Sequence, residues 1–486
     1  MNDATLFANG ISKGFLNLKE YYQELDKSIK MIDSELNAMI EWNMEEVIGE
    51  LDSCSWDKQL PFFGVPIPLK MLGQDKKGWK STYATNYLIN RRAPSDANFV
   101  KRLEAIGFVP VGQSSSSELG LKNTTNSLLY GAVKNPWNLD YSPGGSSGGA
   151  AALVASGLFP IAAASDGGGS IRIPASYCGL IGLKPTRGAM PTGPLTWRAW
   201  QGAAVDFALT VSMRDTESLF YLMHGNHNAA PYHPPKIERS ESDRNKKKLR
   251  IGVVEEFLTD QSISLEAKQA LKNSIKELEH MGQEVELIHW PIRNSEVLDS
   301  YSLVNIVETT STLLNIQKER KLPINSEDVE PFTWVIYQCG KHIDATSYIT
   351  ALSIWDKLAY QMESIFCEYD LILTPTTADS APLIKDELIL NNEVGSILTI
   401  IDALSKDELV ESVFGLFRTM FSSTPFTPLA NITGIPAISL PTHITKKGMP
   451  LGIQFMAAKG REDLLFNIGE RFEQQKLFKL PKRYER

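Results

Sequence analysis

The chain has 486 residues, of which 43% are hydrophobic and 22% are charged, and its formal net charge is -8. This composition is typical of a globular protein with a large apolar core. A mildly acidic chain lacks the electrostatic footprint of a protein that binds nucleic acid or an anionic membrane, so we expect neither partner.

The chain contains four widely separated cysteines: Cys54, Cys178, Cys339 and Cys367. Their spacing fits neither paired metal ligands nor a disulfide framework, so we expect reduced and mostly buried thiols. The first residues lack a basic stretch followed by an apolar one, which predicts no signal peptide. The most apolar region, Ala150 to Ala164, is too short and too interrupted to span a bilayer. These features predict a cytoplasmic protein.

The first predicted element is an amphipathic helix, because apolar residues between Leu18 and Leu36 recur at steps of three and four. A short buried strand is expected at Phe108 to Val111. Farther along, a helix over Ala150 to Ala155 precedes a strand over Pro160 to Ala164, and the glycines Gly167 to Gly169 then form a turn.

The second half of the chain begins with a loop, since Pro, Asn and charged residues dominate Asn226 to Asn245. A helix follows from Ser264 to Met281, and then a half-buried strand around Val285 to Leu287. Apolar segments at Leu371 to Leu373 and Ile435 to Leu440 look like further strands of the same sheet. Intermingled helices and strands predict an α/β fold, in which the loop does not separate independent domains.

The densest chemical signal is a Gly/Ser-rich block from Ser142 to Pro185. Within it, Gly167 to Ser170 lie between a predicted strand and a predicted helix. Consecutive backbone N–H groups in such a turn can converge on one point, as an oxyanion hole requires. The positive end of a helix there would favour negative charge further.

A lysine, Lys70, closes the apolar stretch that starts at Pro61. If this stretch is buried, desolvation lowers the pKa of the lysine, and the neutral amine can act as a base. A serine hydroxyl needs such a partner to become a nucleophile.

These segments resemble the amidase signature family, and the resemblance spans nearly the whole chain. It rests on the following segments: 64–70 (GVPIPLK), 135–138 (NPWN), 144–185, 370–375 (DLILTP), 431–441 (NITGIPAISLP) and 448–454 (GMPLGIQ). Within the family, the chain is most similar to the branch that contains hydrolases of nylon oligomers such as cyclic 6-aminohexanoate dimer.

The resemblance implies an amidase with an α/β/α sandwich around a mixed, mostly parallel central sheet. It also implies one domain over residues 1–486, with a variable, partly helical region at 226–370 that shapes the pocket. The substrate would be a small-molecule amide, cyclic or linear. No cofactor and no metal are expected, and a homodimer is compatible with the sequence.

The resemblance also implies a Ser–Ser–Lys triad. Ser170 matches the nucleophile that forms the acyl-enzyme. Ser146 matches the serine, carried on a cis peptide bond, that relays the proton. Lys70 matches the base.

The same resemblance assigns the oxyanion hole and its support. The backbone N–H groups of Gly167, Gly168 and Gly169, together with that of the nucleophile, would hold the oxyanion. Asp166 and Arg172 would brace the turn, although Arg172 could instead meet a substrate carboxylate.

The chain also departs from the family pattern at three places. Met71 stands where an acidic residue usually follows the lysine. Gln113 to Ser115 replace a common Lys-Thr-Asn, and a Ser-Leu-Asp is missing from Gln201 to Asp206. None of these departures touches the triad, so they concern the substrate pocket. Aromatic residues (Trp197, Trp200 and Phe332) suggest that this pocket takes an apolar group.

Two other functions stay open at this point. Gly144 to Gly148 also fit G-x-S-x-G, the nucleophile elbow of α/β-hydrolase esterases, which would make Ser146 the nucleophile and require a histidine. The ammonia-releasing subunit of tRNA-dependent amidotransferases shares the triad. A P-loop is discounted because Ala150 and Ala151 stand where Lys and Ser/Thr belong. His224 and His227 lack acidic neighbours, so we interpret them as solvated rather than metal-binding.

Overall fold

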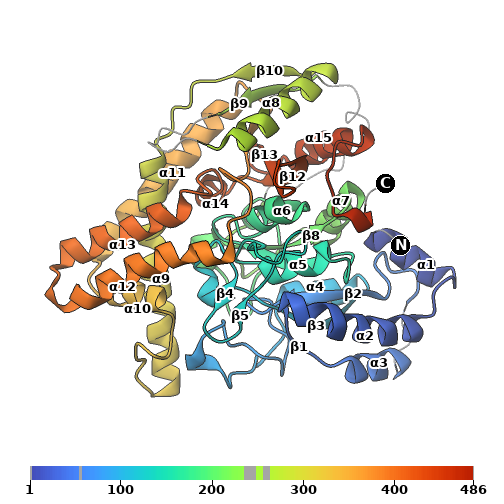
Figure 1. The fold of residues 1–486 in the computed structure, drawn as a ribbon, viewed down its shortest axis with the longest axis horizontal. Coiled ribbons are helices and arrows are strands. Elements are labelled where there is room, and N and C mark those ends of the chain that lie inside the picture. The colour runs from blue at the N-terminus through green and yellow to red at the C-terminus, as the bar shows by residue number, and fades with distance from the viewer. Residues whose placement is uncertain (1–2, 54–56, 235–247, 256–262, 485–486) are drawn as a thin grey trace.

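The computed structural model describes residues 3–53, 57–234, 248–255 and 263–484. An eight-stranded sheet, in the order β10-β9-β11-β13-β12-β7-β8-β6, lies at its centre and is flanked by helices (Figure 1). Its strands in chain order are β6 (Ala162–Asp166), β7 (Ile181–Lys184), β8 (Val205–Thr210), β9 (Arg250–Val253), β10 (Glu284–Leu287), β11 (Leu371–Pro375), β12 (Ala437–Ile444) and β13 (Pro450–Met456). The predicted α/β class is confirmed.

The sheet is mixed, as predicted, but the prediction that it is mostly parallel is wrong. Only the β10–β9 and β9–β11 pairings are parallel, whereas the other five pairings are antiparallel. Two connections explain this. Strand β8 lies between β6 and β7 and runs antiparallel to both, and a short turn joins β12 to β13 as a hairpin.

A second, three-stranded sheet carries the predicted lysine. It contains β1 (Met39–Trp42), β2 (Val65–Lys70) and β3 (Phe108–Ser114), with β3 in the middle. Every residue of β2 is buried, and this strand packs against β6 of the large sheet. Lys70, the last residue of β2, is thereby brought beside the strand that precedes the glycine turn. A two-stranded ribbon, β4 (Asn126–Ser127) and β5 (Gly131–Ala132), completes the sheets.

The helices surround these sheets, and α9 to α13 gather on one side of the molecule (Figure 1). Their bounds are α1 (Ala4–Ser12), α2 (Leu18–Leu36), α3 (Met44–Ser53), α4 (Asn98–Ala105), α5 (Gly148–Ala155), α6 (Arg172–Cys178), α7 (Met213–Met223), α8 (Leu265–His280), α9 (Asn294–Arg320), α10 (Pro331–Gly340), α11 (Ala345–Phe366), α12 (Leu388–Ile400), α13 (Lys406–Phe421), α14 (Pro428–Thr433) and α15 (Glu462–Gln474).

Local sequence signals explain where several predicted elements begin and end. The side chain of Asn17 caps α2 by accepting a bond from the Glu20 N–H, and Ser264 caps α8 in the same way. Gly282, directly after the C-cap of α8, has a φ of +75°, a conformation that glycine adopts readily. The predicted strands at 108–111, 285–287, 371–373 and 435–440 all exist with bounds shifted by a few residues.

Other expectations concern single residues and segments. Cys178 and Cys339 are buried free thiols, as predicted, but Cys367 is exposed, and Cys54 lies outside the described residues. The predicted loop at 226–245 is described only up to residue 234. Among the helices that the structure describes, none is both long and apolar enough to cross a bilayer.

Candidate active site

The glycine turn connects β6 to α6 and is organised by Asp166, the last residue of β6. Its carboxylate accepts hydrogen bonds from the N–H groups of Gly169 (2.7 Å) and Ile171 (3.2 Å). It also accepts a 3.4 Å bond from the N–H of Arg172. Asp166 therefore fixes the path of the chain on both sides of Ser170, which is the supporting role that the resemblance implied.

Arg172 braces Asp166 from the first turn of α6. Its guanidinium donates two 2.9 Å bonds to the Asp166 carboxylate and further bonds to Asn431 Oδ1 (2.6 Å), Gln454 Oε1 (2.6 Å) and the Thr427 carbonyl (2.9 Å). Both charged side chains are fully buried. Because every nitrogen of the guanidinium is engaged, Arg172 is not available for a substrate carboxylate, and that alternative is excluded.

Close packing explains why three glycines precede Ser170. A Cβ added at Gly167 would lie 2.6 Å from the Trp200 ring, and one at Gly168 would collide with the Tyr301 hydroxyl. Gly169 has a φ of +131°, a left-handed conformation that side chains disfavour.

The turn leaves three N–H groups available for an oxyanion. Gly169 donates its N–H to Asp166, so the structure does not support the expectation that this group belongs to the oxyanion hole. Within the described ranges, the N–H groups of Gly167, Gly168 and Ser170 have no acceptor.

Lys70 and Ser146 are in direct contact, as the resemblance implied. The Lys70 Nζ donates a 2.8 Å bond to the Ser146 Oγ and a 3.0 Å bond to the Ser165 Oγ. The Gly145–Ser146 peptide bond is cis, as expected.

The environment of Lys70 favours the neutral amine. The side chain is fully buried, and this burial lowers its pKa from 10.5 to about 7, against the opposing effect of the Asp206 and Asp166 carboxylates. An amine with this pKa is partly unprotonated at neutral pH, as a general base must be.

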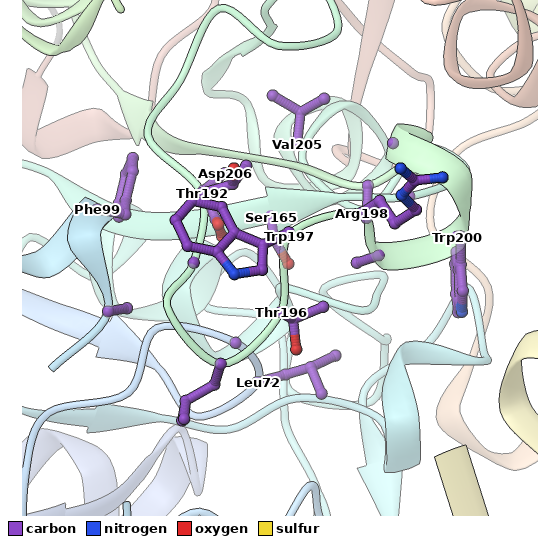
Figure 2. Close-up of a pocket in the computed structure, with 18 of the residues that line it drawn as sticks. Leu72, Phe99, Ser165, Thr192, Thr196, Trp197, Arg198, Trp200, Val205 and Asp206 are labelled. Carbon is purple, nitrogen blue, oxygen red and sulfur yellow. The ribbon is translucent and has the colours of Figure 1, made fainter. Parts of the chain in front are cut away.

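A cavity of about 730 Å³ lies next to the glycine turn (Figure 2). Ser146, Ser165, Gly167 and Ser170 line it at the reactive end. Figure 2 shows Phe99 and Trp200 on opposite sides of the view with Trp197 between them. The rest of its lining includes Leu72, Asp75, Tyr83, Met190, Leu195, Arg198, Asp206, Tyr232, Glu308, Thr309 and Thr312.

The cavity tests the residues expected to shape the pocket. Trp197 and Trp200 do line it, and Tyr232 and Glu308 come from the variable region 226–370. The expectation for Phe332 is wrong: it is 3% exposed and packs against Phe417 in the core.

The contacts of the histidines bear on both a nucleophile elbow and a metal site. In the described part of the chain, no histidine is hydrogen-bonded to Ser146 or Ser170. A nucleophile elbow would need such a histidine. Over the same residues, no group of three His, Cys, Asp or Glu is placed to hold a metal ion.

Sequence reasoning missed several residues that build the site. Asn431 and Gln454 anchor Arg172, and both lie in segments that carried the resemblance. Ser165, Gln74 and Asp206 surround Lys70, and no motif assigned a role to any of them, although Ser165 lies inside the Gly/Ser-rich block. For Gln74 and Asp206 the only sequence signal was a polar residue close to apolar ones.

Comparisons with known proteins agree with this geometry. The sequence model of the Amidase family matches residues 18–466. A lipoamidase of Enterococcus faecalis is 35% identical over 441 residues, which cover 90% of this chain but only 58% of that longer protein. The 6-aminohexanoate-cyclic-dimer hydrolase of Paenarthrobacter ureafaciens is 30% identical over 484 residues, which cover 97% of this chain and 94% of that protein.

A solved structure gives the same result. The structure of 6-aminohexanoate cyclic dimer hydrolase complexed with substrate superposes with a TM-score of 0.87 at 29% identity, covering 99% of both chains. The predicted likeness to the nylon-oligomer branch is thereby confirmed. The chain belongs to the amidase signature family and is a hydrolase of carbon–nitrogen amide bonds.

Proposed function

We propose that the chain hydrolyses small-molecule amides through an acyl-enzyme on Ser170. The observation that carries this proposal is the buried contact between Lys70 and Ser146 beside the turn that holds Ser170. The proton of the Ser170 hydroxyl passes to Ser146, and the proton of Ser146 passes to the neutral Lys70. The Ser170 oxygen then attacks the amide carbonyl carbon.

The collapse of the tetrahedral intermediate uses the same side chains, with the proton moving in the opposite direction. The N–H groups of Gly167, Gly168 and Ser170 stabilise the oxyanion. As the C–N bond breaks, the ammonium of Lys70 returns its proton through Ser146 to the leaving amine. Water, activated by the same relay, then hydrolyses the ester on Ser170. Both nucleophile and base are side chains of the protein, so the scheme requires no metal or cofactor.

We further propose that the acyl group is an extended aliphatic chain. The cavity offers Leu72, Phe99, Met190, Trp197 and Trp200 to such a chain. The related hydrolase acts, by its name, on the cyclic dimer of 6-aminohexanoate. A cavity of about 730 Å³ falls in the size range of small-molecule sites.

A panel of linear amides of increasing acyl length tests this substrate class. Each methylene buried contributes about 0.8 kcal/mol, so kcat/KM is expected to rise about fourfold per methylene until the cavity is filled. Ser170→Ala protein is the negative control for contaminating hydrolases. No dependence on chain length would contradict the proposal. Preferential use of glutamine by a protein that co-purifies with a second subunit would instead support ammonia release for a partner.

A homodimer and a cytoplasmic location both stay predictions, although the buried free thiols of Cys178 and Cys339 fit a reducing compartment.

A further inference from the structure

A carboxylate that no motif singled out, Asp206, lies beside the base. It belongs to β8 and lines the cavity close to Ser165 (Figure 2). Ser165 is its partner in the antiparallel register of β6 and β8. The Ser165 hydroxyl accepts a hydrogen bond from the Lys70 Nζ. Asp206 therefore lies directly opposite, on the neighbouring strand, a residue that contacts the base.

Gln74 ties this carboxylate to the backbone of the base. Its Oε1 accepts the Lys70 N–H at 2.8 Å, and its Nε2 donates to Asp206 Oδ1 at 3.1 Å and to the Ala164 carbonyl at 2.9 Å. Gln74 is fully buried, so this connection is held in place by the core.

The second carboxylate whose charge acts on Lys70 already has a cationic partner. Asp166 is paired with the buried guanidinium of Arg172. Asp75, which lies near Asp206, accepts a 2.8 Å bond from Ser81 and is influenced by the nearby Arg91. Like Asp75, Asp206 has no salt bridge among the residues that the structure describes, but unlike Asp75 it is one of the carboxylates whose charge acts on Lys70.

The residue next to the base supplies no charge. Met71 follows Lys70 directly, is 1% exposed, and has its sulfur in contact with the Thr82 hydroxyl. Two carboxylates act on the charge of Lys70, those of Asp166 and Asp206. In the described part of the chain, Asp206 is the one of the two that has no cationic partner.

We propose that Asp206 is a positioning residue whose carboxylate stabilises the Lys70 ammonium that forms during proton relay from Ser170. This inference rests on the function proposed above, because it assumes that Lys70 is the base. Burial raises the pKa of Asp206 to about 6, which leaves the carboxylate ionised at neutral pH. Its charge raises the pKa of Lys70 and opposes the effect of burial there.

The Asp206→Asn variant tests the charge alone, since asparagine keeps the size and still offers Gln74 an acceptor. Removing a nearby opposite charge lowers the pKa of a lysine. The rising limb of kcat/KM against pH should therefore move to lower pH by about one unit. Above the limb, kcat should fall about tenfold, because the ammonium formed in the transition state is less stable. Steady-state kinetics across the acid and neutral range measure both effects.

Two further variants separate this role from a structural one. Asp206→Glu keeps the charge and should return the limb to its wild-type position. Asp215→Asn removes another buried carboxylate whose pKa is also raised to about 6. Its partners are Ala4 and Thr5 rather than Lys70, so the limb should not move.

The contradicting outcomes are distinct. The role proposed for Asp206 would be overturned if the rising limb of kcat/KM against pH did not move in Asp206→Asn protein. It would also be overturned if the limb of Asp206→Glu protein differed from that of the wild type. A rise in KM without movement of the limb would also overturn it and assign Asp206 to substrate binding. If Lys70→Arg protein remained active, the proposed function would fail first, irrespective of these variants.

Discussion

Replacing Lys70 with arginine is expected to abolish turnover as completely as replacing it with alanine. Arginine keeps a positive charge but does not give up its proton at working pH. The structure places Lys70 in full burial with its pKa at about 7. We expect each variant to lose at least about a thousandfold in kcat, because the relay has no other base. Activity measurements on purified, folded variants check this result.

The relay also predicts that substitutions of Lys70 and Ser146 have strongly coupled effects on kcat, since the Lys70 Nζ lies 2.8 Å from the Ser146 Oγ. Residues that act as one unit give non-additive losses, so the double alanine variant should lose far less than the product of the two single losses. In the wild type, kcat/KM should rise with pH through about 7 and then level off, because deprotonation of Lys70 activates the relay. Substantial activity in Lys70→Arg protein would show that the lysine serves only as a fixed charge.

Loss of Arg172 is expected to have the largest effect on stability. Arg172→Met leaves the carboxylate of Asp166 buried without its charged partner, a change that costs about 3–5 kcal/mol. Denaturant unfolding measures the loss. Arg418→Ala is the comparison: this arginine pairs with Asp299 and Glu411 but is 42% exposed, and such surface pairs contribute about 0–1 kcal/mol.

The stability lost in Arg172→Met should depend on pH, and this dependence shows whether the unpaired Asp166 carboxylate causes the loss. Arg172 holds the pKa of Asp166 well below its usual range, so the wild type gains stability above the unfolded pKa of the carboxyl and loses it on acidification. Without Arg172, burial raises the pKa of Asp166. The difference in the free energy of unfolding between the variant and the wild type should therefore become smaller as the pH falls. Adding Asp166→Asn to Arg172→Met should recover part of the stability. A double variant that is less stable than Arg172→Met alone would contradict this explanation.

How much the sequence predicts depends on the range of the interaction. The glycine turn and its flanking elements follow from contiguous residues, and the Lys70–Ser146 contact came from the resemblance. The direction of the strands was missed, because nothing in the local pattern of β8 shows that it inserts between β6 and β7. Phe332 was misassigned because an aromatic residue on a buried helix has the same pattern in a core and in a pocket.

The partners of the catalytic groups are the other part that sequence patterns could not supply. Asn431 reaches Arg172 from 259 residues away, and Asp206 reaches Gln74 across 132 residues. Such contacts depend on how the two sheets and α14 pack together, and no periodicity of a single segment records that packing.

The identity of the nucleophile tests the proposed mechanism most directly. Incubation with a fluorophosphonate, followed by mass spectrometry of the digested protein, locates the serine that forms a covalent bond. The proposed mechanism predicts one adduct on Ser170, and none in Ser170→Ala protein. An adduct on Ser146 in the wild type would contradict it and favour a nucleophile elbow instead.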